Sequence, residues 1–423
     1  MQNYQRIARS LDEEDPLRRF RDQFVQDTGL IYLDGNSLGR LPKRTVELTE
    51  NLVKEEWGGR LIRSWNERWM DLPRRIASKI AALVGAQDDE ILVGDSTTVN
   101  LYKLAFATLA YQSGRKIIIS DELNFPADLY VLQGLIKHQF PDHSLRLAES
   151  TDGIMVDEDK LRGLLGTDTA LVVLSHVAFK SSFMYDMEQV NRFAHDKGSL
   201  VIWDLSHASG AVQVKLNLAN ADMAVGCTYK YLNGGPGSPA FLYVRRDLQQ
   251  KLENPVTSWF GHSRPFDFDL EYDPASSVQK FAAGTPGILS MAAIEPGLDL
   301  ILEAGIERIR GKSVQQSEFL MELTKELPER NGFRIASPSD SGQRGSHVSI
   351  QHGEAYRICR AMIEPADDSM AVIPDFRPPD NIRLGISPLY TSFVNIHYTI
   401  SRMARIVESR EYERFSSKRS GVT

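Results

Sequence analysis

Short apolar runs alternate along this chain with longer stretches in which apolar residues recur every three or four positions. We expect buried strands at Glu90–Val93, Lys116–Ser120, Ala170–Ser175, Ser199–Trp203, Met223–Val225 and Ala240–Val244. Helical spacing lies between several of these runs, at Val99–Tyr111, Ala127–His138 and Met187–Lys197. This alternation predicts an α/β fold with a mainly parallel sheet, of the seven-stranded type, that helices flank on both faces.

The pattern changes toward both ends of the chain. Residues 44–86 have long helical periodicity, and residues 296–327 have the spacing of one long helix or two. Beyond them, strand patterns at 345–352, 370–373 and 381–386 and helical patterns near 354–363 and 394–408 predict a smaller α+β domain. We therefore expect an N-terminal segment, 1–45, that packs with the small domain, a large domain, 46–295, and a small C-terminal domain, 296–423.

Two of the predicted strands end in polar side chains that suit one cofactor. Asp204 ends one apolar run and is followed by His207, and Lys230 comes shortly after the run Met223–Gly226, beside a Gly-rich loop. Carboxyl ends of neighbouring parallel strands share one edge of a sheet, where ligands bind. A lysine there can form a Schiff base with pyridoxal phosphate (PLP), and an Asp can pair with the ring nitrogen and keep it protonated. The pair predicts an enzyme of amino-acid chemistry.

Each of these residues also has a structural interpretation. Lys230 could be a solvated surface charge, Asp204 could cap the next helix, and His207 could be a satisfied core histidine. Lys230 instead follows a run that looks buried and adjoins a Gly loop, where desolvation suits a reactive amine. Because His207 comes three residues after Asp204, we expect it beside the cofactor.

Two further segments could complete a cofactor site. The turn with Thr97 and Thr98 opens a helix, where free N–H groups and hydroxyls bind anions, although an ordinary N-cap explains the pattern equally well. Phe125 could stack on a flat ring, with Asp128 nearby, or both could serve as a core aromatic and a cap. Ser175 and Tyr229 could add hydroxyls to the phosphate or to the lysine.

One arginine lies inside an apolar C-terminal strand. A buried Arg383 needs an anionic partner. An amino-acid α-carboxylate would pair with it in a bidentate way, and a structural salt bridge is the alternative.

Composition excludes several other functions. The chain of 423 residues is 42% hydrophobic and 25% charged, and its net charge of −7 gives no global attraction to nucleic acid or an anionic membrane. Two cysteines, Cys227 and Cys359, are too few for a disulfide framework or a cysteine-built metal site, and we expect no metal. The first residues have no apolar core of a signal peptide, and no apolar run approaches about 18 residues. We expect a cytoplasmic protein whose partner is a small molecule.

Several motifs together resemble one enzyme family. They are Tyr32–Gly39, Leu61–Asn66, Asp95–Leu101, Asn124–Tyr130, Asp204–Gly210, Tyr229–Gly235, Trp259–His262 and Arg383–Phe393. From about residue 10 to residue 408 the chain resembles the kynureninases, and most closely the bacterial ones. These are PLP-dependent enzymes of fold type I in the class V aminotransferase superfamily.

The resemblance implies a role for each candidate residue. Lys230 would carry PLP, Asp204 would bind the ring nitrogen with His207 close by, and Phe125 would stack on the ring. Thr97, Thr98 and Tyr229 would hold the phosphate, with Asp128 and Ser175 nearby. Arg383, with Asn36 and Ser37, would bind the substrate. Trp259 and the loop that carries Thr285 would complete the site from the partner subunit of a homodimer.

The implied reaction is hydrolysis of L-kynurenine to anthranilate and L-alanine, in tryptophan catabolism, with the 3-hydroxy substrate as a second possibility. Lys230 would remove the Cα proton, and Tyr229 would shuttle a proton. One segment departs from the family. Residues 176–182 read His-Val-Ala-Phe-Lys-Ser-Ser, where bacterial kynureninases usually read His-Val-Asn-Tyr-Arg-Thr-Gly.

This departure keeps another β-acyl or aryl amino acid open as the substrate. Cysteine desulfurase activity is disfavoured because no cysteine has a mobile-loop context. A catalytically silent binding homologue is disfavoured because Lys230, Asp204 and Arg383 are all retained.

Overall fold

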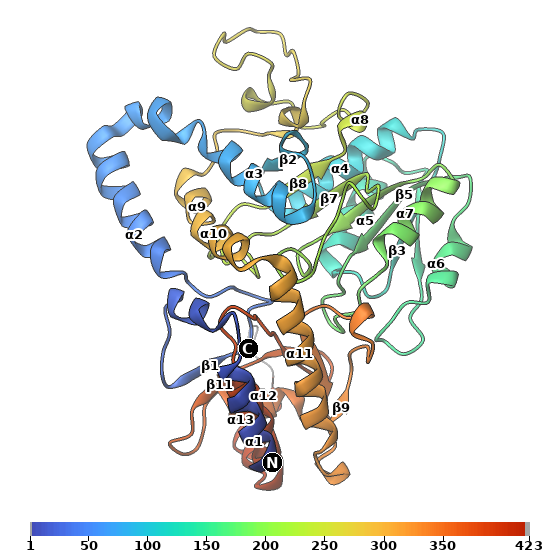
Figure 1. The fold of residues 1–423 in the computed structure, drawn as a ribbon. Coiled ribbons are helices and arrows are strands. Elements are labelled where there is room, and N and C mark those ends of the chain that lie inside the picture. Colours follow the sequence, from blue (N-terminus) through green and yellow to red (C-terminus); the bar gives the residue numbers. More distant parts are fainter. Residues whose placement is uncertain (1, 419–423) are drawn as a thin grey trace.

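A seven-stranded sheet organises the larger part of the molecule (Figure 1). In this computed structural model, which describes residues 2–418, the strand order is β2-β8-β7-β6-β5-β3-β4. The strands are β2 (Ile91–Val93), β3 (Ile117–Asp121), β4 (Ser144–Ala148), β5 (Thr169–Ser175), β6 (Leu200–Asp204), β7 (Met223–Gly226) and β8 (Phe241–Val244). β8 is antiparallel to both of its neighbours, and the other pairs are parallel. The predicted α/β fold with a mainly parallel sheet is confirmed.

Helices cover both faces of this sheet because successive side chains of a strand point to opposite sides. Ile117 and Ile119 of β3 belong to one core, which they share with Ile80. Ile118, between them, belongs to a second core with Leu104. The helices of this part are α2 (Lys43–Asn51), α3 (Leu72–Val84), α4 (Thr97–Tyr111), α5 (Pro126–His138), α6 (Glu158–Leu164), α7 (Met187–Asp196), α8 (Arg246–Gln249), α9 (Ile288–Ala292) and α10 (Glu295–Ala304).

The smaller part contains a third core and both the first and the last described helices of the chain (Figure 1). A four-stranded antiparallel sheet has the order β12-β13-β10-β9, and β1 pairs in parallel with β11. Helix α1, near the N-terminus, packs against α13. The elements are α1 (Gln2–Glu13), β1 (Leu30–Tyr32), α11 (Ile306–Lys325), β9 (Arg334–Ile335), β10 (Val348–Gln351), α12 (Ala355–Ile363), β11 (Ala371–Ile373), β12 (Asp375–Arg377), β13 (Asn381–Leu384) and α13 (Phe393–Glu408).

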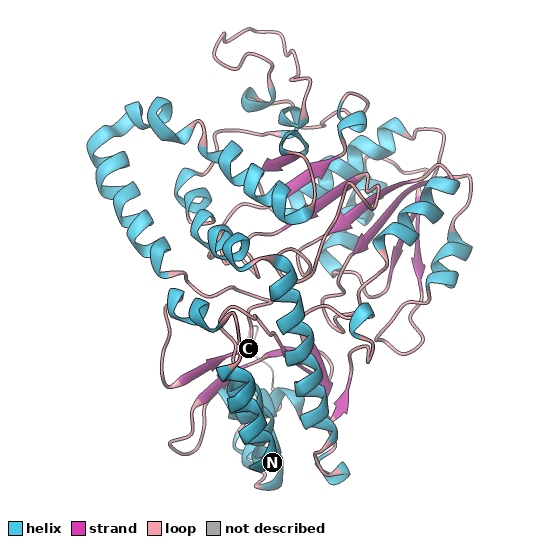
Figure 2. Ribbon diagram, viewed as in Figure 1, coloured by secondary structure: helices cyan, strands magenta, loops and turns pink. Residues whose placement is uncertain are grey.

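Two stretches with predicted helical periodicity are divided into several elements. The periodic stretch 44–86 comprises α2, the π-helical stretches Leu52–Arg60 and Trp65–Trp69 with a short 3-10 turn between them, and α3. α2 and the π-helical stretches make the arm at the left of Figure 2, whereas α3 packs against the sheet. Leu61 has a positive φ of 56°, which breaks the regular helix. The stretch 296–327 is two helices, α10 and α11, because Gly305 between them has a φ of 80°.

The sequence pattern missed β4, β9, β12 and α6. β4 is a half-exposed edge strand, and β9 and β12 are only two and three residues long. Short or exposed strands carry little apolar signal. Across residues 2–418 no helix has both the length and the apolar character needed to span a bilayer.

Candidate functional site

A cavity of about 340 Å³ lies at the carboxyl ends of the central strands. The strand register places Ser175 opposite Asp204 and Asp204 opposite Val225, so the ends of β5, β6 and β7 meet at one edge. The cavity is lined by Asp95, Ser96, Thr97, Thr98, Phe125, Ala127, Asp128, Asp204, Ser206, Tyr229, Lys230, Gly237, Ser238 and Ala240. Seven residues that the sequence predicted for the cofactor and the chemistry are therefore brought together.

Asp204 is the last residue of β6 and is buried. Its Oδ1 accepts two hydrogen bonds from Ser206, one from the backbone N–H at 2.8 Å and one from Oγ at 2.6 Å. Burial raises the pKa of this carboxyl, and the nearby Lys230 ammonium and the Ser206 hydrogen bonds act in the opposite direction. The arrangement presents a carboxylate that favours a cationic or protonated partner in the cavity.

Lys230 follows β7 and reaches the same cavity. Its Nζ lies 3.3 Å from His207 Nε2 and 5.8 Å from the centroid of the Phe125 ring. Burial and the Lys230 charge lower the pKa of His207, so its ring is neutral and can accept a hydrogen bond from the ammonium. The backbone beside Lys230 is held by a distant part of the chain, because the Gly39 N–H donates to the Tyr229 carbonyl at 2.8 Å.

The turn before α4 has the features of both interpretations that the sequence left open. Ser96 caps the helix, since its Oγ accepts from the Val99 N–H at 3.3 Å. Thr97 and Thr98 begin the helix and line the cavity. The cap and a set of hydroxyls and N–H groups at a helix N-terminus are therefore present together, which is the arrangement that binds anions.

Asn124 connects Phe125 with Ser175. The Asn124 Oδ1 accepts from the Phe125 N–H at 2.8 Å and from Ser175 Oγ at 2.7 Å. Ser175 therefore lies behind the cavity wall rather than in it. Asp128 is buried, its Oδ2 has no hydrogen-bond partner within the described chain, and burial followed by the Asp204 charge raises its pKa.

Arg383 lies on β13 and is buried. It makes an ion pair with Asp375 at 2.5 Å, which is the structural interpretation of this residue. Its Nη2 also donates to Ser37 Oγ at 2.8 Å and its Nη1 to the Phe179 carbonyl at 2.6 Å. With its amide oxygen turned toward the guanidinium, Asn36 accepts from Nε at 2.6 Å. The three residues predicted for the substrate are thus gathered in one network.

Two of the predicted residues that do not line the cavity of Lys230 lie in separate loops. Thr285 lines an adjoining space of about 280 Å³, which shares Asp95 and Gly237 with that cavity. Trp259 is 43% exposed and stacks on Phe268 within its own loop. These two side chains therefore do not meet Lys230 within one chain.

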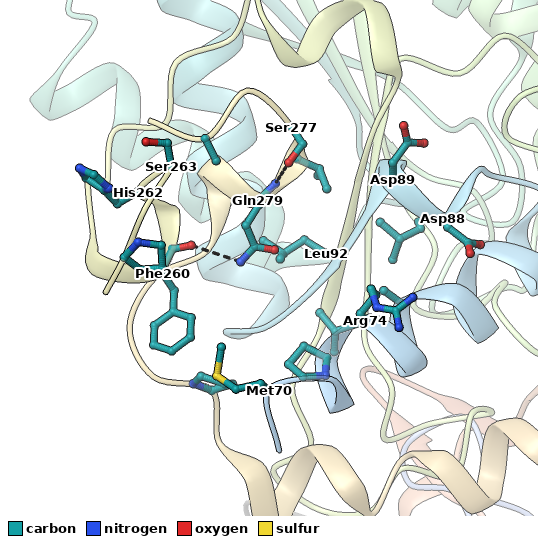
Figure 3. A pocket seen from close by; sticks show the side chains of 18 of the residues that line it. Met70, Arg74, Asp88, Asp89, Leu92, Phe260, His262, Ser263, Ser277 and Gln279 are labelled. Carbon is teal, nitrogen blue, oxygen red and sulfur yellow. Dashed lines mark hydrogen bonds between the residues drawn. The ribbon is translucent and has the colours of Figure 1, made fainter. Parts of the chain in front are cut away.

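A larger cleft, of about 690 Å³, lies between the start of α3 and the loop 260–279 (Figure 3). Gln279 lies on the loop side of this cleft, where its Nε2 donates to the Phe260 carbonyl at 3.2 Å. None of the predicted site residues lines it. This cleft is therefore separate from the cavity that gathers the predicted cofactor residues.

Comparisons with known proteins decide the family. Over 408 residues the chain is 38% identical to "Kynureninase" of Pseudomonas fluorescens, and the match covers 95% of each chain. The chain belongs to the kynureninase family. A relative with the same name in Burkholderia mallei is 39% identical over 410 residues, 96% of each chain, and residues 309–403 match the family model "Kynureninase C-terminal domain". The resemblance read from the motifs is confirmed.

Solved structures confirm the fold. A cysteine desulfurase from Thermococcus onnurineus NA1, in its apo form, superposes with a TM-score of 0.80, covers 92% of this chain and 98% of its own, and is 17% identical. A variant of C-DES with glycine covalently linked to its PLP cofactor has a TM-score of 0.79, covers 91% of this chain and 98% of its own, and is 16% identical. At this identity the likeness establishes the architecture alone.

Several residues of the site were not predicted from the sequence. Ser206 could have been found, because it follows a strand-end Asp within the same motif. Phe179 was noted only as a departure from the family, yet its ring contacts Phe125 edge-on at 5.3 Å. Asp375 and His347 reach the site through the antiparallel sheet, and no local pattern in the sequence marks them.

Proposed function

We propose that this chain is a PLP-dependent kynureninase that hydrolyses L-kynurenine to anthranilate and L-alanine, as in tryptophan catabolism. The observation that carries the proposal is the joint position of Lys230 and Asp204 in one cavity of a chain that belongs to this family. Bacterial relatives named for this activity match over nearly the whole length. The 3-hydroxylated substrate would react by the same chemistry.

The residues of the cavity fit PLP. Asp204 would pair with the ring nitrogen, Phe125 would lie against the ring, and the start of α4 with Thr97 and Thr98 would bind the phosphate. The unpartnered Oδ2 of Asp128 is a polar atom that a cofactor would satisfy. When bound, PLP supplies an aldehyde that takes up the substrate amine and a ring that accepts electrons from Cα and Cβ.

Lys230 is our candidate for the proton transfers at Cα. Its amine would first anchor the cofactor and, once the substrate amine has displaced it, would accept the Cα proton as a base. His207, 3.3 Å away and neutral, would hold this amine in place. Tyr229 would act as a donor because burial raises the pKa of its hydroxyl, so the hydroxyl keeps its proton at neutral pH.

Arg383 would bind the substrate α-carboxylate. The Ser37 hydroxyl and the Phe179 carbonyl are neutral partners that a carboxylate could replace, while Asp375 would keep the buried charge paired between turnovers. The overall reaction balances with one water: the Cβ–Cγ bond breaks, the water hydroxyl goes to the acyl carbon, and a proton goes to Cβ.

A second substrate remains a candidate because of one segment. The side chains at Ala178, Phe179 and Lys180 lack the amide, the phenol and the guanidinium that bacterial kynureninases usually carry there. Phe179 contacts Phe125 at the site, so the exchange bears on how the aryl end is held. A different β-acyl or aryl amino acid is therefore the alternative.

We further propose a cytoplasmic homodimer with shared active sites, built from the segment 1–45, the large domain 46–295 and the small domain 296–423, of which 419–423 lie outside the described residues. Trp259 and Thr285 would reach the cavity of the other subunit. The exposure of Trp259 and of apolar side chains on the arm, such as Trp57 and Ile62, supports this proposal.

The test uses the full chain with PLP and L-kynurenine. We expect anthranilate fluorescence, and its absence would refute the substrate. Lys230→Ala should abolish turnover and the visible cofactor absorbance, whereas Lys251→Ala, which removes a surface lysine, should change neither. A panel that includes 3-hydroxykynurenine and other β-acyl amino acids would decide between the candidates, and light scattering would measure the oligomeric state.

A further inference from the structure

His347 stands at the edge of the small sheet, next to the residues that Arg383 gathers. The register of β10 and β13 pairs Val348 with Leu384 and Ser349 with Arg383. Since side chains alternate along a strand, His347 and Ser349 lie on the same face as Arg383. This is the face that Lys180 also meets, because Ser349 Oγ donates to its carbonyl.

One residue, His207, lies between the His347 ring and Lys230. The centroid of the His347 ring lies 5.7 Å from that of His207, whose Nε2 contacts the Lys230 amine. His347 is 0% exposed. Neither of its ring nitrogens makes a hydrogen bond of normal geometry within the described chain, although the Phe179 backbone lies close by.

The imidazole is neutral in this position. Burial lowers its pKa well below the usual value, and the Arg383, Lys230 and Arg377 charges lower it further. A neutral ring has one nitrogen that donates and one that accepts. A buried polar group without a partner is costly, and because His347 lies beside Arg383 and His207, a molecule bound between these residues could supply the partner.

The substrate side chain is the part that can reach this ring. If the substrate carboxylate binds Arg383 and its Cα lies near Lys230, the substrate atoms beyond Cβ point away from the line that joins these two residues. Diagonal side chains of paired strands are about 7 Å apart, which is within reach of a group two bonds from Cα. Phe125 and Phe179 offer no polar atom in their rings, and His207 already contacts the lysine.

We propose that His347 hydrogen-bonds the side-chain carbonyl oxygen of the substrate, next to the carbon–carbon bond that breaks. This inference rests on the proposed function, because it assigns the ketone of that substrate to a residue of this site. The contact would orient the acyl carbon toward the attacking water and would have no role for an amino acid without a side-chain carbonyl.

The experiment compares two reactions of the holoenzyme. The first is kynurenine hydrolysis, and the second is exchange of the Cα proton of L-alanine in D₂O, followed by NMR, which needs Lys230 and the cofactor but no ketone. His347→Leu should lower kcat/KM for kynurenine by roughly 10- to 100-fold and leave alanine exchange within about twofold of wild type. His347→Gln, whose amide can donate and accept, should recover most of the loss.

His143→Leu is the matched control, since His143 is also buried with both ring nitrogens unpartnered but lies outside the site. It should change neither reaction. If His347→Leu does not fold, His347→Asn, which is too short to reach, should show the same selective loss.

An unchanged kynurenine rate in the His347 variants, or equal losses in both reactions, would overturn the contact. A wild-type enzyme that exchanges alanine but does not hydrolyse kynurenine would refute the proposed substrate and the contact with it. Normal wild-type turnover combined with an unaffected His347→Leu variant would refute the contact alone.

Discussion

Substitution of Lys103 tests whether a buried ion pair stabilises the turn that carries Thr97 and Thr98. The Lys103 side chain is 0% exposed, and its Nζ lies 2.7 Å from Asp95 Oδ2 and 2.7 Å from the Phe281 carbonyl. Asp95 opens the turn that contains Thr97, and Phe281 leads into the loop that carries Thr285. One buried charge therefore ties the turn before α4 to the segment that leads into the Thr285 loop. Lys103→Met removes this charge and preserves most of the volume.

The expected loss of stability follows from the burial of Lys103 and Asp95. Breaking a fully buried ion pair from one side costs about 3–5 kcal/mol. The Asp95 side chain is 25% exposed, so water can compensate part of this loss. Including the lost bond to the Phe281 carbonyl, we expect a decrease of about 3 kcal/mol in the free energy of unfolding. A looser turn should also weaken PLP binding by roughly tenfold, about 1.4 kcal/mol.

Urea unfolding of the cofactor-free protein, followed by circular dichroism, measures the stability, and a PLP titration followed by absorbance measures the affinity. Lys251→Met, on the surface, is the control and should change neither quantity. The double variant Asp95→Asn with Lys103→Met should be more stable than Lys103→Met alone, because no unpaired carboxylate remains. A Lys103→Met protein within about 0.5 kcal/mol of wild type would refute the reasoning.

Three further predictions concern single contacts. Burial raises the pKa of Asp121 to about 6, and the Tyr185 hydroxyl, 2.9 Å away, opposes this rise by donating to the carboxylate. Tyr185→Phe should therefore raise the pKa of Asp121 further. It should lower the free energy of unfolding by about 1–2 kcal/mol at pH 8, where the carboxylate is charged, and by much less at pH 5. Equal losses at both pH values in urea unfolding would contradict this. Gly39→Ala should lower kcat/KM by roughly tenfold or more, because its Cβ would lie 2.2 Å from the Lys230 carbonyl oxygen. Gly94→Ala, whose Cβ would meet nothing within 4 Å, should leave kcat/KM unchanged in the same assay. Ser182 has a φ of 69° and a buried hydroxyl without a partner, so Ser182→Gly should raise the free energy of unfolding by about 0.5–1 kcal/mol, and a lower value would count against the strain.

The cofactor half of the site could be predicted because it depends on strand ends. Asp204 and Lys230 follow apolar runs, and parallel strands bring such ends to one edge whatever the details of packing. The strand bounds differ from the predicted ones by one residue or so for the same reason: a buried run has a clear apolar signal but a vague end.

The small-sheet half could be predicted only in part. Arg383 was found because a charge inside an apolar strand is unusual, but its partner Asp375 lies on a three-residue strand with no pattern of its own. The position of His347 depends on the antiparallel register of β10 and β13, which a single sequence does not specify. Contacts between side chains that depend on strand register can be identified only from the structure.

The geometry also limits what the unusual segment 178–182 can change. The loop of residues 34–39 contacts both functional halves, since Gly39 binds the Tyr229 carbonyl and Ser37 binds Arg383. The segment itself binds the small sheet through the carbonyls of Phe179 and Lys180, which are backbone groups that any side chain would leave in place. The span from Lys230 to Arg383 is therefore independent of the exchanged side chains. It follows that the exchanged side chains act on the part of the substrate beyond Cβ. A change in substrate preference should therefore appear among substrates with different aryl groups and not among substrates that differ at the α-amino or α-carboxylate group.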